Sequence, residues 1–312
     1  MSGAVDTLGA QEPVPDLTPA APGGAMSGKP RSMTRRMAEV FFENKLGVLG
    51  LAILVVMVGF CFLGPLFYHT DQIHTNLDSV TLTPGSPSHP LGTDEEGYDE
   101  LGRLMVAGQS SLEVGVAAGL IASVVGTLYG AISGYFGGWV DALLMRILDA
   151  AYSLPSIFIL LYLAATVGRG KFTIILVIGL TLWLLLPRLV RGETLTLKTR
   201  EYVQAVRVMG GGSNRIIYRH ILPNAIGTIV VSVTFIIADA IFALSTLSFI
   251  GLGLESPQID WGGMLNAGTN YVFDGYWWLV YPPGIAIILV IISFNFIGDA
   301  LRDAFETRLQ KR

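Results

Sequence analysis

The chain has 312 residues, of which 52% are hydrophobic and only 14% are charged, and its mean hydropathy is +0.57. Because an ordinary soluble domain is roughly 25% charged, this composition excludes a soluble globular protein and indicates an integral membrane protein. The formal net charge is -4, and the single cysteine, Cys61, excludes an internal disulfide and a cluster of thiolate metal ligands.

Residues 1–34 are rich in proline, glycine and alanine and show no apolar periodicity, which predicts a disordered tail. They do not have the basic start and short apolar core of a cleavable signal peptide. Within residues 35–45, Met37, Val40 and Phe41 place apolar groups on one side of a short helix. This pattern favours an interfacial helix that lies along the membrane surface before the first span.

Six stretches provide about the 20 apolar residues that an α-helix needs to cross a hydrocarbon core of about 30 Å. They lie at residues 46–67, 112–135, 142–167, 172–189, 226–250 and 278–298. The fold class is therefore predicted to be an all-α integral membrane protein with six transmembrane helices. Residues 68–111 are expected to form an outer loop, residues 112–300 a core of five helices, and residues 301–312 a tail.

The distribution of lysine and arginine predicts the orientation, because basic flanks stay in the cytoplasm. Five basic residues precede the first span and seven occupy the loop after the fourth, whereas residues 68–111 hold one, Arg103, against seven acidic residues. The loop after the fifth span is acidic and the final tail is basic. Both termini are therefore expected to be cytoplasmic, and only Arg169 and Lys171, in a short outer turn, disagree.

Glycines recur along the second span and favour close approach of another helix. They are Gly115, Gly119, Gly126, Gly130, Gly134 and Gly138, the last four at strict four-residue spacing. Packing within the fold is the simpler interpretation, and a stripe that slides during a conformational cycle is the alternative. Pro155 in the third span and Pro187 at the end of the fourth permit bends, as hinges or as static kinks.

Polar groups within spans are costly, so each is a candidate functional group. Arg146 and Asp149 lie three residues apart and are expected to form a structural ion pair, with Asp149 a second candidate for the translocation path. Asp239 lies in the middle of the fifth span, where lining a transport route and making a local hydrogen bond are both open. Asn295 is predicted mainly to fix the end of the last helix, with contact to cargo as its alternative.

The loop between the fourth and fifth spans is basic and is broken by glycines. Residues 201–209 are predicted to form a short helix that the glycines at 210–212 end, and Ser213 to cap a second helix that runs to His220. Pro223 is expected to stop that second helix and turn the chain into the next span. Two short helices at an angle make a compact knob, which suits a docking element better than a plain surface connector.

This loop resembles the EAA motif of bacterial ABC importer permeases, which runs Glu-Ala-Ala, three residues, Gly, nine residues, then Ile-x-Leu-Pro. The matching positions carry Ala205, Gly210, Leu222 and Pro223, with Gln204 in place of the glutamate. The segments 44–46, 89–94, 220–224, 247–253, 261–262 and 294–303 extend the resemblance to the C-type permease of dipeptide, oligopeptide and nickel importers. The residues expected to couple to an ATPase are Gln204, Ala205, Gly210, Gly211, Ser213, Leu222 and Pro223.

The resemblance implies a type I ABC importer permease fold in the bacterial cytoplasmic membrane. It implies a non-catalytic subunit that forms a heterodimer with a B-type permease and works with two ATP-binding subunits and an extracellular or periplasmic peptide-binding protein. ATP and Mg would lie on the ATPase partners, and we expect this chain to bind no cofactor, metal or nucleic acid. Relatives often carry arginine where Tyr98 and Gln109 stand, so docking of the delivery protein through charges at those two positions is not expected.

Other classes fit the sequence less well. A secondary transporter driven by an ion gradient needs charged relays within the membrane, for which Asp239 alone is weak support. A membrane enzyme needs a Ser/His/Asp, Cys/His or paired-histidine constellation, and none is recognisable. Within the importer family the cargo stays open among peptides, nickel complexes, glutathione and haem-like molecules.

Overall fold

The computed structural model describes residues 33–306, and within this range every regular element is helical. Apart from Met33 and Thr34, which open the first helix, the predicted disordered tail of residues 1–34 lies outside the described residues. Residues 307–312 also lie outside them. Only two isolated β-bridges occur in the described range, both in the long loop of residues 68–99. The predicted all-α class is confirmed.

The α-helices of the described residues include most of the predicted spans. They are α1 (Met33–Glu43), α2 (Lys45–Phe67), α3 (Glu100–Phe136), α4 (Gly138–Tyr152), α5 (Ser156–Val167), α6 (Lys171–Leu182), α7 (Leu186–Leu197), α8 (Glu201–Val208), α9 (Ser213–Ile216), α10 (Leu222–Phe249), α11 (Trp261–Thr269) and α12 (Tyr281–Glu306). The short turns are η1 (Leu77–Ser79), η2 (Ile217–Ile221), η3 (Val272–Asp274) and η4 (Trp277–Leu279).

Four of the helical stretches are long and apolar enough to cross a membrane by themselves, and two bent pairs bring the number to six if each pair is one span. The chain is therefore a multi-pass membrane protein. The pair α4 and α5 is bent by 79° and the pair α6 and α7 by 50°. Both breaks lie at the predicted prolines: Pro155 directly precedes α5, and Pro187 is in the first turn of α7. Proline lacks an amide donor, so it starts a helix more readily than it continues one.

The prediction that residues 68–111 form a loop was wrong at its far end, because α3 begins at Glu100. Asp99 caps this helix, its Oδ1 accepting a hydrogen bond from the Gly102 amide at 2.8 Å. A helix of 37 residues is about 55 Å long, almost twice the thickness of a hydrocarbon core. Its first turns therefore extend beyond the apolar layer.

Helix α3 lies at the centre of the fold, and its glycines allow two other helices to approach it closely. A Cβ atom added at Gly119 would lie 2.6 Å from Cγ1 of Ile237 on α10, and one added at Gly130 would lie 2.5 Å from the carbonyl oxygen of Pro187 on α7. The packing interpretation of the glycine stripe is thereby confirmed. Gly138 does not belong to it, because it has a positive φ of 53° and nothing lies within 4 Å of a Cβ placed there.

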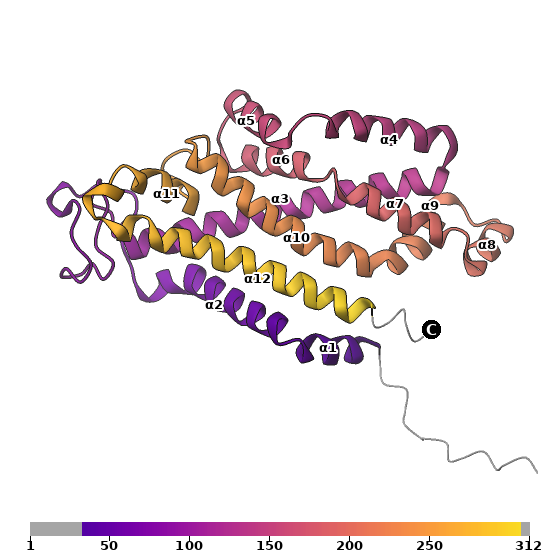
Figure 1. Ribbon diagram of the computed structural model, residues 1–312, viewed down its shortest axis with the longest axis horizontal. Helices are drawn as coiled ribbons and strands as arrows, with labels where there is room; N and C mark the ends of the chain where they lie inside the picture. The colour runs from indigo at the N-terminus through magenta and orange to yellow at the C-terminus, as the bar shows by residue number, and fades with distance from the viewer. Residues whose placement is uncertain (1–32, 307–312) are drawn as a thin grey trace, which may run out of the picture.

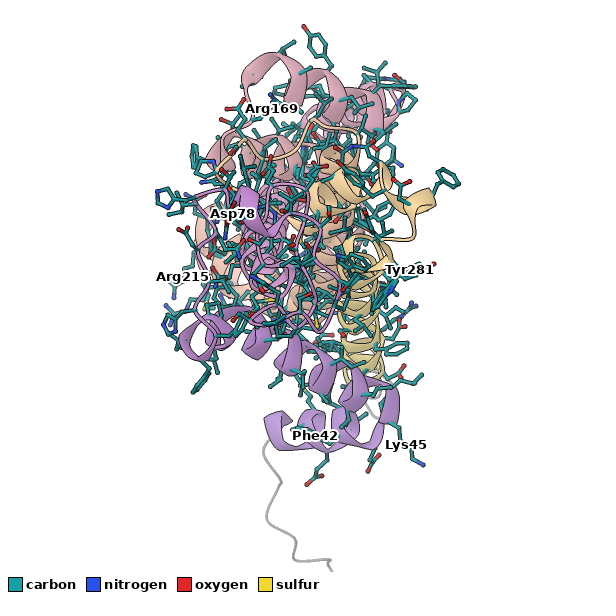
Figure 2. All side chains as sticks on the ribbon, turned by 90° about the vertical axis from the view of Figure 1, so that its left-hand side faces the viewer. Phe42, Lys45, Asp78, Arg169, Arg215 and Tyr281 are labelled. Carbon is teal, nitrogen blue, oxygen red and sulfur yellow. The ribbon has the colours of Figure 1, made fainter. Side chains whose placement is uncertain are left out.

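The elongated molecule has two distinct ends (Figure 1). The loop of residues 68–99 and α11 lie at one end, which we call the α11 end, and α8 lies at the other, the α8 end. Helix α12 runs from the α11 end toward the α8 end. Figure 2, which views the α11 end, shows Asp78 in front, with Arg169 and Phe42 on opposite sides of the body.

The α11 end is anchored by Trp261, which is fully buried between α3 and α11. Its indole nitrogen donates to the carbonyl of Leu104 at 3.0 Å, and its backbone amide donates to Oγ of Ser111 at 3.1 Å. Asp260 caps α11 by accepting from the amides of Gly262 and Gly263. These contacts hold the segment between α10 and α12 against the extended start of α3.

Helix α1 matches the short helix predicted within residues 35–45. Phe42 is 62% exposed, and Asn44 separates α1 from α2. The Asn44 side chain accepts from the amides of Leu46 and Gly47 and donates through Nδ2 to Asp303 of α12 at 3.0 Å. The first span is thus tied to the end of the last one.

Candidate functional site: the α8 loop and the exposed face of α10

The first helix of the predicted knob ends as the sequence indicates. Helix α8 stops at Val208, and Gly210 adopts a positive φ of 82°. The Gly210 amide donates to the carbonyl of Arg207 at 3.0 Å, and the Gly211 amide donates to that of Val206 at 2.9 Å. These two bonds form a Schellman motif, which requires a left-handed residue at the position of Gly210.

Gly211 is required for a different reason. A Cβ atom there would lie 2.5 Å from Cγ1 of Val206 and 2.8 Å from its carbonyl oxygen. Gly212, in contrast, has an ordinary φ of -67° and open space around it. The three consecutive glycines therefore differ: the first supplies a conformation, the second a close approach, and the third neither.

The second half of the predicted knob was wrong in two respects. Gly212, not Ser213, occupies the cap position of α9, and no side chain caps this helix. Pro223 does not stop the helix either, because the chain stays helical from Ser213 to Phe249. The π-helical turn η2 joins α9 to α10, with the Leu222 amide donating to the carbonyl of Ile217. Pro223 falls in the first turn of α10, where its missing donor is tolerated.

The α8 loop is packed onto the body of the protein and is not a free connector. Val203, Ile216 and Ile221 are fully buried in one cluster, against which Tyr135 at the end of α3 packs. The Arg207 guanidinium lies 5.7 Å from the centre of the Tyr135 ring. The α8 loop is therefore in contact with both α3 and the helix that contains α10.

The structure distributes the predicted coupling residues between the exposed tip and the body. Gln204, Ala205 and Gly210 are exposed, and Nε2 of Gln204 donates to the carbonyl of Lys198 at 2.9 Å. Leu222 is half-buried against the core. The sequence reasoning missed the tip itself, where Val208 is 88% exposed and Met209 76% exposed. Two adjacent apolar side chains just before a glycine were the available signal.

The three candidates for a translocation path lie on three different helices. Asp239 is exposed on α10, on the same face as Phe242 and Phe249, which are 61% and 46% exposed. Asn295 on α12 donates to the carbonyl of Ile291 on its own helix. Asp149 is on α4, across the body from α12 (Figure 1). They do not form one site within this chain; Asp149 is exposed as Asp239 is, but it is paired with Arg188.

The predicted ion pair between Arg146 and Asp149 was wrong in its partner. Asp149 accepts from Arg188 on α7 at 2.8 Å, and this guanidinium also lies 4.5 Å from the centre of the Tyr152 ring. A second pair joins the same helices, since Arg191 binds Asp141 through two nitrogens at 2.5 and 2.6 Å. The sequence reasoning treated these arginines only as markers of orientation, whereas they fasten α4 to α7.

The side chains of Tyr98 and Gln109 both make hydrogen bonds within the chain. Tyr98 is only 8% exposed and donates through its hydroxyl to the carbonyl of Ile73 at 3.1 Å. Gln109 donates to the carbonyl of Cys61 at 2.8 Å. Both side chains are used in contacts within the chain.

Comparisons with known proteins give a consistent result. Residues 126–311 match the family described as "Binding-protein-dependent transport system inner membrane component", and residues 32–84 match the "N-terminal TM domain of oligopeptide transport permease C". The dipeptide transport system permease protein DppC of Bacillus subtilis is 38% identical over 86% of this chain and 84% of its own. The oligopeptide transport system permease protein OppC of Escherichia coli K12 is 39% identical over 89% of this chain and 92% of its own.

A solved structure, the MetNI methionine ABC transporter in inward-facing conformations, shares the fold. Its matching chain aligns with a TM-score of 0.52 and 18% identity, over 67% of this chain and 97% of that chain.

Proposed function

This chain belongs to the family of inner membrane components of binding-protein-dependent transport systems, and on that premise we propose that it is the C-type permease subunit of an ATP-driven peptide importer. It forms half of the translocation path and receives mechanical work from an ATPase subunit that binds the α8 loop. The chain itself is not an enzyme: ATP and Mg are bound by the partners.

The observation that carries this proposal is the exposed apolar tip of the α8 loop. The side chains of Val208 and Met209 are 88% and 76% exposed and follow Arg207 in the chain. The fully buried cluster of Val203, Ile216 and Ile221 supports the loop that carries them. Adjacent exposed apolar side chains on a rigid support are typical of a surface that another protein covers. Because Gln204 carries no charge, the contact depends on packing at the tip and around Ala205.

The proposed topology follows from the same ends of the molecule. The α8 end faces the cytoplasm of the bacterial cell, because the basic loop lies there and because α1 and the last turns of α12, which carry Arg35, Arg36 and Arg302, lie toward that end (Figure 1). Each bent pair is one span, which gives six transmembrane helices with both termini in the cytoplasm. The α11 end then faces outward, toward the protein that delivers the cargo.

Coupling operates through the continuous helix from Ser213 to Phe249. ATP binding draws the two ATPase subunits together, each carries one permease loop with it, and the permeases rotate between inward-open and outward-open arrangements. The face of α10 that carries Asp239 and Phe242 turns toward the companion B-type permease, so Asp239 lines the path at their junction.

Peptide is the proposed cargo because the two relatives described above carry dipeptide and oligopeptide transport in their names. Nickel complexes, glutathione and haem-like molecules remain alternative cargoes in such systems. Ligand copurified with the associated solute-binding protein, identified by mass spectrometry, decides among them.

The proposal is tested by replacing the tip. In the complex reconstituted with its partner subunits, Val208→Asp places a charge in the packed contact, so we expect peptide uptake to fall at least about tenfold and the ATPase subunit to bind more weakly. Val272→Asp, which changes a 46% exposed valine at the α11 end, is the matched control and should keep both activities. Normal uptake by Val208→Asp, or uphill transport without any ATPase, would contradict the proposal.

A further inference from the structure

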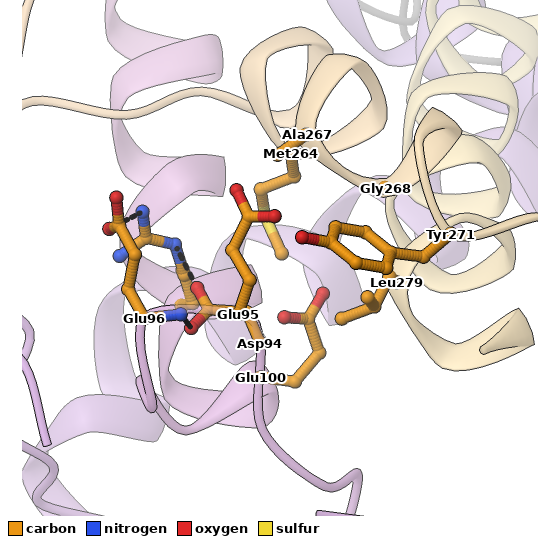
Figure 3. Close-up of a pocket in the computed structure, with 10 residues that line it drawn as sticks. Asp94, Glu95, Glu96, Glu100, Met264, Ala267, Gly268, Tyr271 and Leu279 are labelled. Carbon is orange, nitrogen blue, oxygen red and sulfur yellow. Dashed lines mark hydrogen bonds and ion pairs between the residues drawn. The ribbon is translucent and has the colours of Figure 1, made fainter. Parts of the chain in front are cut away.

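A small acidic cavity lies at the α11 end, remote from the α8 loop. Its volume is about 70 Å³, and it opens between the loop residues before α3, the first turn of α3 and the segment from α11 to η4 (Figure 3). Four carboxylates, those of Asp94, Glu95, Glu96 and Glu100, line it together with a single cation, Arg103. The cavity therefore holds more negative than positive charge.

Arg103 does not neutralise the whole cluster. Its guanidinium is 3.1 Å from Asp94 and 3.7 Å from Glu96, and it lies 4.2 Å from the centre of the Tyr98 ring. These contacts direct the cation to one side of the cavity. Burial raises the pKa of Asp94, which marks this corner as poorly hydrated although Arg103 opposes the shift.

Glu100 is the group that this arrangement leaves without a partner. It is only 2% exposed, and its carboxylate points into the cavity in Figure 3. Within residues 33–306, no hydrogen bond or ion pair joins this carboxylate to another residue. Burial raises the pKa of Glu100 well above its ordinary value although Arg103 opposes the shift, so the charged form of Glu100 is favoured when a cation from outside the chain lies beside it.

The geometry restricts which cation fits. The described residues contain no group of three or more acidic, histidine or cysteine side chains arranged to hold a metal ion. A space of about 70 Å³ has room for about five groups of the size of water, each of which needs about 10–15 Å³ of such space, so the end of one side chain fits and a whole peptide does not. An ammonium group is compact and carries three donors, which suits a cavity with carboxylates on several sides.

The walls also suit the end of a lysine side chain. The hydroxyl of Tyr271 points into the cavity in Figure 3, where its oxygen can accept a hydrogen bond from an ammonium group. Met264 and Leu279 provide apolar contact for the methylenes. A lysine side chain combines these two properties, because its charged end is carried on an apolar stem.

We propose that this cavity is a docking socket for one lysine of the external solute-binding protein, whose ammonium group pairs with Glu100. This inference rests on the proposed function, which places such a protein at the α11 end. Charge complementarity supports that partner, since residues 68–111 hold seven acidic residues against one basic residue. A cationic patch on the binding protein would be steered to this surface, and the socket would fix its orientation.

The test uses the complete transporter in lipid nanodiscs and its purified solute-binding protein. Glu100→Gln keeps the shape of the side chain and removes its charge, so we expect the dissociation constant of the binding protein to rise at least about tenfold. Asp78→Asn is the matched control: it removes one charge from an exposed position of the same loop, outside the cavity, and should change binding by less than about twofold. Glu95→Gln is a second variant, which removes another carboxylate of the cavity and retains Glu100.

The lysine of the solute-binding protein that pairs with Glu100 is identified by a double-mutant cycle. Each exposed lysine of the binding protein is replaced by glutamine in turn. One of these variants should weaken binding to the wild-type transporter as much as Glu100→Gln does, and should cause no further loss when combined with Glu100→Gln. If Glu100→Gln binds as wild type, whatever the effect of Glu95→Gln, if no lysine couples to Glu100, or if Glu100→Gln instead separates the two permease subunits, the inference is wrong.

This outcome is distinguishable from failure of the proposed function. A wild-type complex that binds no external protein and hydrolyses ATP without transport would contradict the importer role itself. A wild-type complex that binds and transports, with an unaffected Glu100→Gln variant, would contradict only the docking socket.

Discussion

The two ends of the molecule are built in different ways. At the α8 end, a short helix, a glycine motif and a small buried cluster support an exposed apolar tip, and apart from the contacts of Tyr135, their contacts join residues close in sequence. At the α11 end, Trp261 contacts Leu104, and the cavity unites residues near position 95 with Tyr271. One end presents a bump made by local structure, whereas the other presents a hollow made by long-range packing.

This difference predicts that the α11 end is the more sensitive to loss of a buried side chain. Trp261→Ala removes a fully buried indole and its hydrogen bond, so we expect a loss of about 3–5 kcal/mol of stability. Trp277→Ala is the matched control, because Trp277 is 49% exposed. The stability of each variant is measured by thermal unfolding of the detergent-purified protein, followed by intrinsic fluorescence or by calorimetry without ligand. Equal destabilisation by the two variants would remove the proposed contrast between the ends.

At the α8 end, backbone conformation is the sensitive feature. Gly210→Val forces a β-branched side chain into a positive φ of 82°, at a local cost of about 1–3 kcal/mol. We expect the variant to insert and assemble but to lose most ATP-coupled uptake, because the tip changes direction. Gly212→Ala, at an ordinary φ with open space around it, should transport normally. Uptake assays in proteoliposomes compare the two, and unimpaired Gly210→Val would show that the Schellman turn is dispensable.

A smaller effect is expected at the two ion pairs that fasten α4 to α7. Asp141→Asn breaks a two-nitrogen pair with Arg191 and weakens the bond from Ser133, so we expect about 1–3 kcal/mol of destabilisation. Asp149→Asn breaks a more exposed pair and should cost about 0–1 kcal/mol. Chemical unfolding with a common denaturant series ranks the variants, and the reverse order would refute this assignment.

The contrast between the ends also explains what the sequence could predict. The end of α8 was predictable because glycine at a C-terminal cap position is a local signal, and Gly210 confirmed it. Ser213 and Pro223 were misassigned because the π turn η2 carries the helix onward and moves Pro223 into a permitted first turn. The start of α3 was missed although Asp99 is a good capping residue, since the acidic charges around it resembled a loop.

Partners across the fold were beyond sequence reasoning. Arg146 was the nearest opposite charge to Asp149 along the chain, but Arg188 is nearer in space because α7 runs beside the end of α4. Glu100 was counted only as one of several outward-facing acidic residues. Its isolation depends on Arg103 turning toward Asp94 and on the Tyr271 segment closing the other side of the cavity.

The helix from Ser213 to Phe249 has a mechanical consequence. Its 37 residues span roughly 55 Å as one continuous helical stretch, so a displacement of the α8 loop is transmitted along a stiff rod. The five residues of η2 are wound more loosely than the rest, and they lie near the α8 end of that rod. A change in the winding of η2 would therefore alter how motion of the α8 loop reaches α10. It would leave unchanged both the exposed tip of that loop and the face of α10 that carries Asp239.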